Sequence, residues 1–286
     1  MIVRFLLIII TLFFVRVVYG QYVPTDITLT ENGNVLRNPW AGGMNLPQFS
    51  EVDLNNDGIL DLVVYDREGI VSSTFINGGS AGLVDYDYAP EYMKRFPREV
   101  RNFMLLRDYN CDGIEDIFGM YEVWGQGLGV AVWKGSYDAN DTIQFTLVKD
   151  QLKYDVGSTV LYKMFIYNTD LPAIDDIDGD GDLDILAFTL DLYFPSNVFW
   201  YKNTSFENGY GCDSLDFDLE TQCWGLFDET GDSSIVNFGP STDSCFSNPY
   251  FGQILFDGED KLSNASRNGR HIGANLTSVD FNGDNV

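Results

Sequence analysis

The stretch "DIDGDGDLD" at residues 176–184 places five aspartates within nine residues. Carboxylates packed this densely repel one another, so a folded chain keeps them together only if something neutralises them. Two further stretches share the pattern D-x-[DN]-x-D-G-x-x-D: "DLNNDGILD" at residues 53–61 and "DYNCDGIED" at residues 108–116. A fourth copy, "DFNGDNV", begins at Asp280 and is cut by the end of the sequence. The acidic loop is therefore a repeated element of this chain.

Short apolar segments flank each complete loop, and they are rich in β-branched and aromatic residues, which is typical of strands. Each unit is expected to run strand, acidic loop, strand, turn, strand. The expected strands are 49–52, 62–65 and 73–79 around the first loop, 103–107, 117–121 and 130–136 around the second, and 172–175, 185–188 and 198–203 around the third. The second position of each motif is apolar and is expected to point into the sheet: Leu54, Tyr109, Ile177 and Phe281.

The first aspartates of the four loops are 55, 68 and 104 residues apart. Small antiparallel units recurring at such intervals are typical of the blades of a β-propeller. The sequence therefore predicts an all-β chain that forms about four to five blades. The long third interval is either a blade with an insertion or an extra blade without an acidic loop. Because the sequence ends inside its fourth motif, we expect an N-terminal fragment with an incomplete ring.

The acidic loops match the ligand preference of Ca²⁺, which takes six to eight oxygen atoms from carboxylates, amides and backbone carbonyls. Motif positions 1, 3, 5 and 9 offer side-chain oxygens, position 7 offers its carbonyl, and glycine at position 6 permits the sharp turn. The expected ligands are Asp53, Asn55, Asp57, Ile59 and Asp61; Asp108, Asn110, Asp112, Ile114 and Asp116; Asp176, Asp178, Asp180, Asp182 and Asp184; and Asp280, Asn282 and Asp284.

An EF-hand is excluded, because it requires a glutamate at position 12 and helices on both sides. Position 12 is Val64, Gly119 and Ala187 in the three complete loops. The remaining alternative is a set of solvated acidic turns that bind no metal.

The N-terminal residues 1–20 resemble a secretory signal peptide, with Arg4 before an apolar run that ends at Arg16 and a small-residue cleavage site before Gln21. An uncleaved anchor is the alternative, although the run is short for a membrane span. We therefore expect an exported chain of residues 21–286 with no other membrane span. The net charge of −26 argues against nucleic acid as a partner.

Export would place the four cysteines in an oxidising setting. Cys212, Cys223 and Cys245 cluster in one segment, which favours a local disulfide there, whereas Cys111 lies inside an acidic loop and is a candidate for an unpaired thiol. Four cysteines allow three pairings, and the sequence does not choose between them.

The repeated D-x-[DN]-x-D-G-x-x-D motif between strands resembles the FG-GAP/VCBS repeats of integrin-α-type β-propellers. The stretch "NPWAGGMNLPQFSEVDLNNDGILDLVVYDREG" at residues 38–69 is similar to the opening of secreted VCBS-repeat proteins of the Bacteroidetes type. The resemblance covers about residues 38–286. It implies calcium in the loops, at the ligand positions named above, and a place at the cell surface or outside the cell.

Two functions remain open. The first is a calcium-binding module for cell-surface or extracellular binding and adhesion, with a protein or glycan as its ligand. The alternative is a propeller enzyme that degrades polysaccharides, such as a lyase. The sequence offers few catalytic groups: the single histidine, His271, is expected to be an ordinary loop or strand residue, and the tryptophans are expected in the core rather than stacked on sugars: Trp124, Trp133, Trp200 and Trp224.

Overall fold

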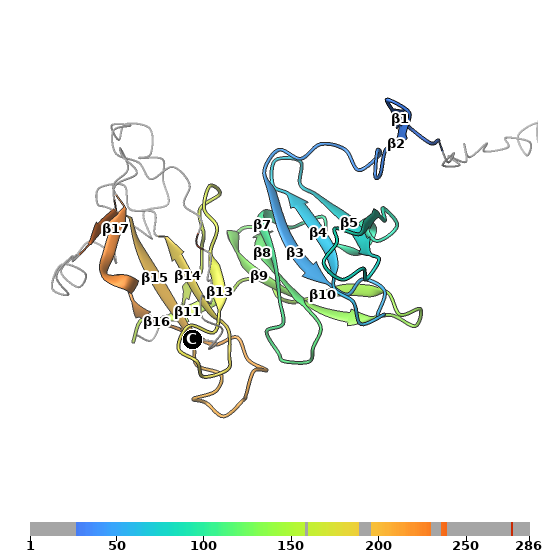
Figure 1. The fold of residues 1–286 in the computed structure, drawn as a ribbon. Coiled ribbons are helices and arrows are strands. Elements are labelled where there is room, and N and C mark those ends of the chain that lie inside the picture. The colour runs from blue at the N-terminus through green and yellow to red at the C-terminus, as the bar shows by residue number, and fades with distance from the viewer. Residues whose placement is uncertain (1–26, 158–159, 189–195, 230–235, 239–275, 277–286) are drawn as a thin grey trace, which may run out of the picture. The chain divides into compact units, whose positions relative to one another are not determined.

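The computed structural model describes residues 27–157, 160–188, 196–229, 236–238 and 276, and these fold mainly as β-strands (Figure 1). The chain divides into two compact units, Met1–Pro39 and Trp40–Val286. The described part of the first unit holds one hairpin, formed by β1 (Thr30–Glu31) and β2 (Asn34–Val35). Its turn is Asn-Gly with positive φ at both residues, as a tight hairpin requires.

The second unit begins with a four-stranded antiparallel sheet. Its strands pair in the order of the sequence: β3 (Pro47–Val52), β4 (Asp61–Asp66), β5 (Val71–Asn77) and β6 (Tyr86–Tyr88). Strand β3 alternates strictly between exposed and buried residues, as expected for a strand that has one face on the core. A 3-10 turn, η1 (Met93–Arg95), follows this sheet.

The second sheet repeats this arrangement with longer strands. It contains β7 (Arg101–Arg107), β8 (Asp116–Val123), β9 (Gly127–Tyr137) and β10 (Ile143–Lys149), again paired in sequence order and antiparallel. Two successive sheets therefore share the same meander topology.

The third sheet has the same meander with an addition at its outer edge. Strands β13 to β16 pair in sequence order and antiparallel, and β11 adds to β16 in parallel, with β12 beyond it. Strand β14 lies between β13 and β15 and is buried along its whole length. The elements from β11 onward have these bounds: β11 (Lys153–Asp155), β12 (Tyr162–Lys163), β13 (Ala173–Asp175), β14 (Asp184–Phe188), β15 (Ser196–Asn203), β16 (Phe217–Thr221), η2 (Trp224–Leu226), β17 (Phe227–Glu229) and β18 (Val236–Phe238).

Successive sheets share hydrophobic cores. One core joins the first sheet to the second and includes Val63 and Tyr65 of β4 together with Met104 and Trp133 of the second sheet. A larger core joins the second sheet to the third and includes the fully buried Phe118. The sheets are therefore held face to face by burial of apolar surface, at about 25 cal/mol per Å².

The first strands of the sheets are also tied together by polar contacts. The side chains of Gln48 and Ser50 in β3 accept hydrogen bonds from the backbone of β7, and Arg107 at the end of β7 donates to the carbonyl of Ile174 in β13. Arg67, after β4, donates to carbonyls that precede β13, at 2.8 Å for Asn168. These hydrogen bonds therefore join the first strands of the three sheets.

The all-β prediction is confirmed, and strands are present at each of the nine segments expected around the three complete loops. None of the three complete acidic loops, all of which the structure describes, is flanked by helices, as the exclusion of an EF-hand requires. The apolar second positions turn inward as expected: Leu54 and Tyr109 are buried, and Ile177 packs against a third core cluster.

One expectation about the core is wrong. Trp124, which lies between β8 and β9, is 97% exposed, because it follows the end of β8 in a turn that projects beyond the sheet. Trp133 is buried as expected, and Trp200 and Trp224 pack against the third core cluster.

Two glycines of β9 give a test of how closely this sheet is packed. A Cβ at residue 135 would collide with the backbone carbonyl oxygen of Glu115, which cannot move without moving the second acidic loop. A Cβ at residue 129 would meet only the flexible side chains of Gln151 and Lys163, at 3.0 and 3.1 Å. We expect Gly135→Ala to lower the free energy of unfolding by about 1–3 kcal/mol, and Gly129→Ala to have a smaller effect. Urea unfolding of both variants measures this, and equal losses would contradict it.

Candidate metal sites

Each acidic loop follows the first strand of its sheet and ends as the second strand begins. Figure 1 shows the three loops, after β3, β7 and β13, at the lower end of their sheets. The Cys111–Cys212 disulfide links the second loop to the segment after β15, and Tyr137 of β9 donates to the carbonyl of Asp53 at 2.9 Å. The three loops therefore belong to one edge of the second unit.

The first aspartate of each loop organises the turn by accepting backbone hydrogen bonds. In the first loop, Oδ1 of Asp53 accepts from the backbone N–H of Asp57 at 3.1 Å, and Oδ2 accepts from Gly58 at 2.7 Å. The other loops repeat both bonds, with Asp112 and Gly113 donating to Asp108 at 3.2 and 2.8 Å, and Asp180 and Gly181 donating to Asp176 at 3.1 and 3.0 Å. The position-6 glycines have φ between +81° and +103°, so the predicted need for glycine is confirmed.

Positions 3 and 5 continue the same network. The side-chain oxygen of position 3 accepts from the N–H of position 5 at 3.2–3.3 Å, and the carboxylate of position 5 accepts from the N–H of position 7 at 2.9–3.1 Å. These are Asx-type turns, which fix the direction of the side-chain oxygens. A carboxylate oxygen has a second lone pair beyond the one that accepts a backbone bond. The loops thus hold several oxygens oriented without using all of their lone pairs.

The last aspartate of each motif has a different role. Asp61, Asp116 and Asp184 are fully buried. Each carboxylate accepts one hydrogen bond from the N–H of motif position 2 and one from an N–H in the third strand of the same sheet. The two distances are 2.9 and 2.7 Å for Asp61, 3.0 and 2.7 Å for Asp116, and 3.3 and 2.7 Å for Asp184. These carboxylates therefore tie the loop to the third strand, a role that the sequence reading did not foresee.

Burial shifts the titration of these three groups. Loss of solvation raises the pKa of Asp116 and that of Asp184 to about 7, and it raises the pKa of Asp61 as well, while the backbone donors oppose the shift in each case. Both oxygens are engaged by backbone amides, so coordination of a metal by position 9 remains a prediction. The same holds for the carbonyl groups of Ile59, Ile114 and Asp182.

The third loop brings three predicted ligands into one group. One carboxylate oxygen from each of Asp176, Asp178 and Asp180 lies within 4.8 Å of the others, a spacing that suits a single cation. The first and second loops carry an amide, from Asn55 or Asn110, where the third carries Asp178. The three loops share one backbone design and differ in charge.

Two lysines face the loops. Nζ of Lys134 in β9 lies 3.0 Å from Oδ2 of Asp112. Lys202 in β15 contacts Asp178, and its Nζ lies 3.6 Å from Oδ2 of Asp180. Each lysine directly precedes the residue whose N–H reaches the buried position-9 carboxylate, and the first loop has Ile76 at that place. An ammonium group therefore neutralises part of the charge of the second and third loops.

A second acidic group adjoins the third loop, and the sequence reading missed it. It contains Asp180, the side chain of Asp182, and Glu207 from the segment after β15, again with oxygens within 4.8 Å of one another. Burial raises the pKa of Asp182 to about 6. The sequence signal for this second acidic group was Asp182, because the other loops have Ile59 and Ile114 at the same motif position.

The disulfide expectation for Cys111 is wrong. Cys111 bonds to Cys212, 101 residues further along the chain, and Cys223 is also disulfide-bonded. Cys111 lies at motif position 4, where its side chain leaves the loop, and both sulfurs lie near the carbonyl of Gly181, at 4.0 and 3.5 Å. Because Cys111 and Cys212 are neighbours in space but distant in sequence, the spacing of the cysteines did not predict this pairing. Cys245 lies outside the described residues.

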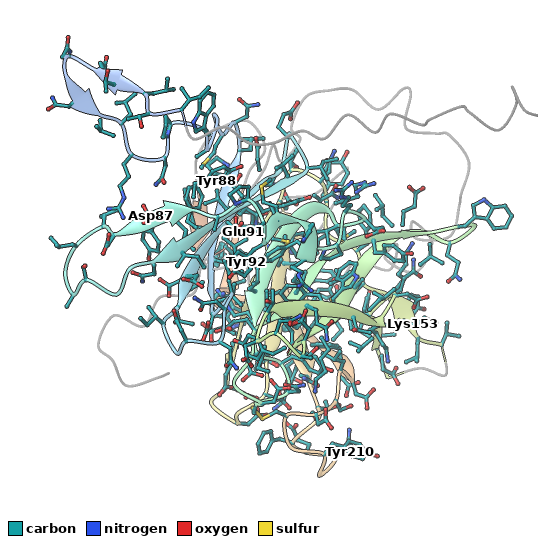
Figure 2. All side chains as sticks on the ribbon, turned by 90° about the vertical axis from the view of Figure 1, so that its right-hand side faces the viewer. Asp87, Tyr88, Glu91, Tyr92, Lys153 and Tyr210 are labelled. Carbon is teal, nitrogen blue, oxygen red and sulfur yellow. A yellow bond between two sulfur atoms is a disulfide. The ribbon has the colours of Figure 1, made fainter. Side chains whose placement is uncertain are left out.

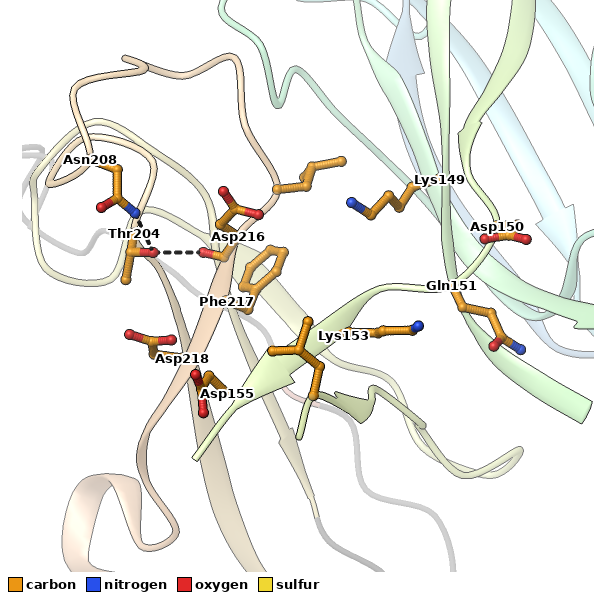
Figure 3. Close-up of a pocket in the computed structure, with 12 residues that line it drawn as sticks. Lys149, Asp150, Gln151, Lys153, Asp155, Thr204, Asn208, Asp216, Phe217 and Asp218 are labelled. Atoms are coloured by element: carbon orange, nitrogen blue, oxygen red, sulfur yellow. Dashed lines mark hydrogen bonds between the residues drawn. The ribbon is translucent and has the colours of Figure 1, made fainter. Parts of the chain in front are cut away.

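A pocket of about 530 Å³ lies where β11 adds to the third sheet. Figure 3 shows Lys149 and Lys153 on one wall and Asp216 on another, and Thr204 donates to the carbonyl of Asp216 at 3.1 Å. The pocket carries charges of both signs, so it is a polar recess that suits a cation less well than the acidic loops do.

Several expected features lie outside the described residues: the fourth loop with Asp280, Asn282 and Asp284, the histidine His271, and residues 1–20. Within the part of the chain that is described, no helix has the length and apolar character needed to cross a membrane. Comparison with known proteins identified no relative: no family model, curated protein or solved structure matches this chain.

The buried position-9 carboxylates should matter even without metal. In Asp61→Asn, the side-chain NH₂ must face the N–H of either Leu54 or Asn77, which leaves a buried donor without an acceptor. We expect the variant to lose about 1–3 kcal/mol of unfolding free energy in the presence of a chelator. Asp57→Asn in the same loop is the control, because Asp57 is exposed and should have little effect under the same conditions. Equal urea midpoints for the two variants would contradict the assignment.

Proposed function

We propose that this chain is an exported, calcium-binding β-propeller protein of the FG-GAP/VCBS type that serves as an extracellular or cell-surface binding and adhesion module. The observation that carries the proposal is the same backbone network in three acidic loops, each between the first and second strands of an antiparallel meander. A set of solvated turns would not require the same loop geometry three times, with the polar side chains held in place by hydrogen bonds.

The propeller part of the proposal is supported by how the sheets pack. Each meander shares a core with the next, and the first strands β3, β7 and β13 are joined by polar contacts. Sheets that stack face to face with their first strands together are the building units of a propeller. The chain would contribute successive blades, with the acidic loops at one edge.

Calcium is proposed because of the donor set. The loops offer carboxylate and amide oxygens, whereas histidine is absent from them and Cys111 is bound in a disulfide. Oxygen donors suit hard cations such as Ca²⁺ and Mg²⁺, and clustered charged carboxylates in a flexible loop suit Ca²⁺ better than the strict octahedron of Mg²⁺. The Cys111–Cys212 disulfide and the signal-like residues 1–20 agree with an extracellular location.

A binding role is favoured because exposed aromatic side chains are available for contact with a partner. Figure 2 shows Tyr210 on the segment after β15, extending away from the sheets, and its exposed fraction is 62%. Trp124 is almost fully exposed on the second sheet. Such groups suit contact with a protein or a glycan.

Calcium should stabilise the folded chain. A cation that binds only the native state at a hundred times its Kd contributes about 2.7 kcal/mol, which corresponds to a rise of roughly 5–10 °C in Tm for a chain of this size. Thermal melts in chelator and in 1 mM Ca²⁺, together with elemental analysis after gel filtration, measure this. Identical melts with no retained calcium would refute the proposed metal sites.

The ligand role needs its own test. The purified chain, with calcium, is applied to glycan and extracellular-protein arrays, and it is incubated in parallel with uronate polysaccharides while absorbance from unsaturated products is followed. We expect calcium-dependent binding without turnover. Product formation would instead identify a lyase.

A further inference from the structure

The third acidic loop carries more negative charge than one cation and its lysine can balance. Its neighbourhood contains six carboxylates, whereas the first loop has three within its motif. The extra groups are Asp178 in place of an asparagine, Asp182 in place of an isoleucine, and Glu207. When all six carboxylates are ionised, the ammonium group of Lys202 and one divalent cation leave a net charge of about −3. Asp178 and Glu207 are exposed to solvent, whereas Asp182 is buried, so Asp182 would gain most from a further cation.

Asp182 supplies an independent sign of a missing partner. Its side chain is 1% exposed, and its Oδ2 accepts from the N–H of Phe206 at 3.0 Å. Its Oδ1 is buried and has no hydrogen-bond partner among the residues that the structure describes. A buried carboxylate oxygen without a partner is costly. Asp182 is also the member of the second acidic group that the repeated motif does not account for.

Glu207 approaches Asp182 from another part of the chain. It lies directly after Phe206, whose backbone N–H donates to Asp182, so the bond that anchors Asp182 also positions Glu207. Its side chain is exposed, and Nζ of Lys202 lies 2.5 Å from its Oε1. The group is therefore assembled from the third loop and from the segment after β15, and its outer side is open to solvent.

We propose that Asp180, Asp182 and Glu207 form a second divalent-cation site, which shares Asp180 with the cation of the third loop. Their carboxylate oxygens lie within 4.8 Å of one another, and Oδ1 of Asp182 offers a free acceptor. Hard divalent cations take such all-oxygen donor sets and complete their shell with water. The inference goes beyond the nine-residue loop sites, none of which uses Glu207 or the side chain of Asp182.

Lys202 competes with the second cation. Its ammonium contacts Asp178 and Glu207 and lies 3.6 Å from Asp180, so it holds positive charge close to the proposed site. Binding of the cation must move the ammonium away or act against its repulsion. Replacing Lys202 by an uncharged residue of similar length should therefore tighten this site.

The test counts calcium ions bound to the full chain after removal of metal, by equilibrium dialysis with Ca²⁺ alone. Glu207→Gln and Asp182→Ile should each bind one calcium fewer per chain than the unsubstituted protein. Asp182→Ile is a conservative choice for the loop, since isoleucine stands at this position in the other two loops and the backbone carbonyl is retained. Lys202→Met should bind the additional calcium roughly tenfold more tightly.

Two matched variants separate this inference from the proposed loop sites. Glu99→Gln removes an exposed glutamate outside the acidic loops and should leave the count unchanged, while Asp108→Asn should remove only the calcium of the second loop. If Asp108→Asn loses one calcium and Glu207→Gln loses none, the second site is refuted and the loop sites stand. If Glu207→Gln loses one calcium and Asp108→Asn loses none, the loop sites are refuted and the second site stands. An unsubstituted chain that binds no calcium refutes both.

Discussion

The buried carboxylate at the end of each acidic motif is the constraint on which the rest of each sheet depends. Asp61, Asp116 and Asp184 each connect the backbone at the start of a loop to the backbone of a third strand. An ionised group is expensive to bury, and two amide donors per carboxylate offset that cost. Once this residue is fixed, the loop must fold back over it, which brings the other acidic side chains together. Their crowding therefore follows from the construction of the sheet, independently of the proposed metal binding.

Neutralisation of the crowded charges then differs from loop to loop. The first loop has an isoleucine at the position where the second and third have Lys134 and Lys202. A lysine supplies a fixed positive charge with modest net stabilisation near the surface, whereas a bound cation supplies two charges and adapts to several oxygens. The same backbone design can therefore give sites of different affinity, set by residues in the third strand outside the repeated motif.

The parts of the fold that follow local rules were predictable from the sequence. Apolar alternation and turn residues located the strands, and the need for positive φ explained Gly58, Gly113 and Gly181. The features that depend on contacts between distant segments were not. Cys111 meets Cys212 because the second loop approaches the segment after β15, and Glu207 of that segment meets Asp182 of the third loop. Trp124 was misjudged because aromatic content predicts burial only within a strand.

The departures from the repeat carry more information about function than the repeat itself. A motif shared by three loops explains how each loop folds, because every sheet needs the same turn. Asp182 does not serve that need, since isoleucine suffices in the other loops, and a buried carboxylate in its place costs free energy. A protein keeps such a group when another interaction offsets the cost. In the third loop the interaction that we propose is with a cation between Asp180 and Glu207, and the loop with the least favourable electrostatics would gain most from binding it.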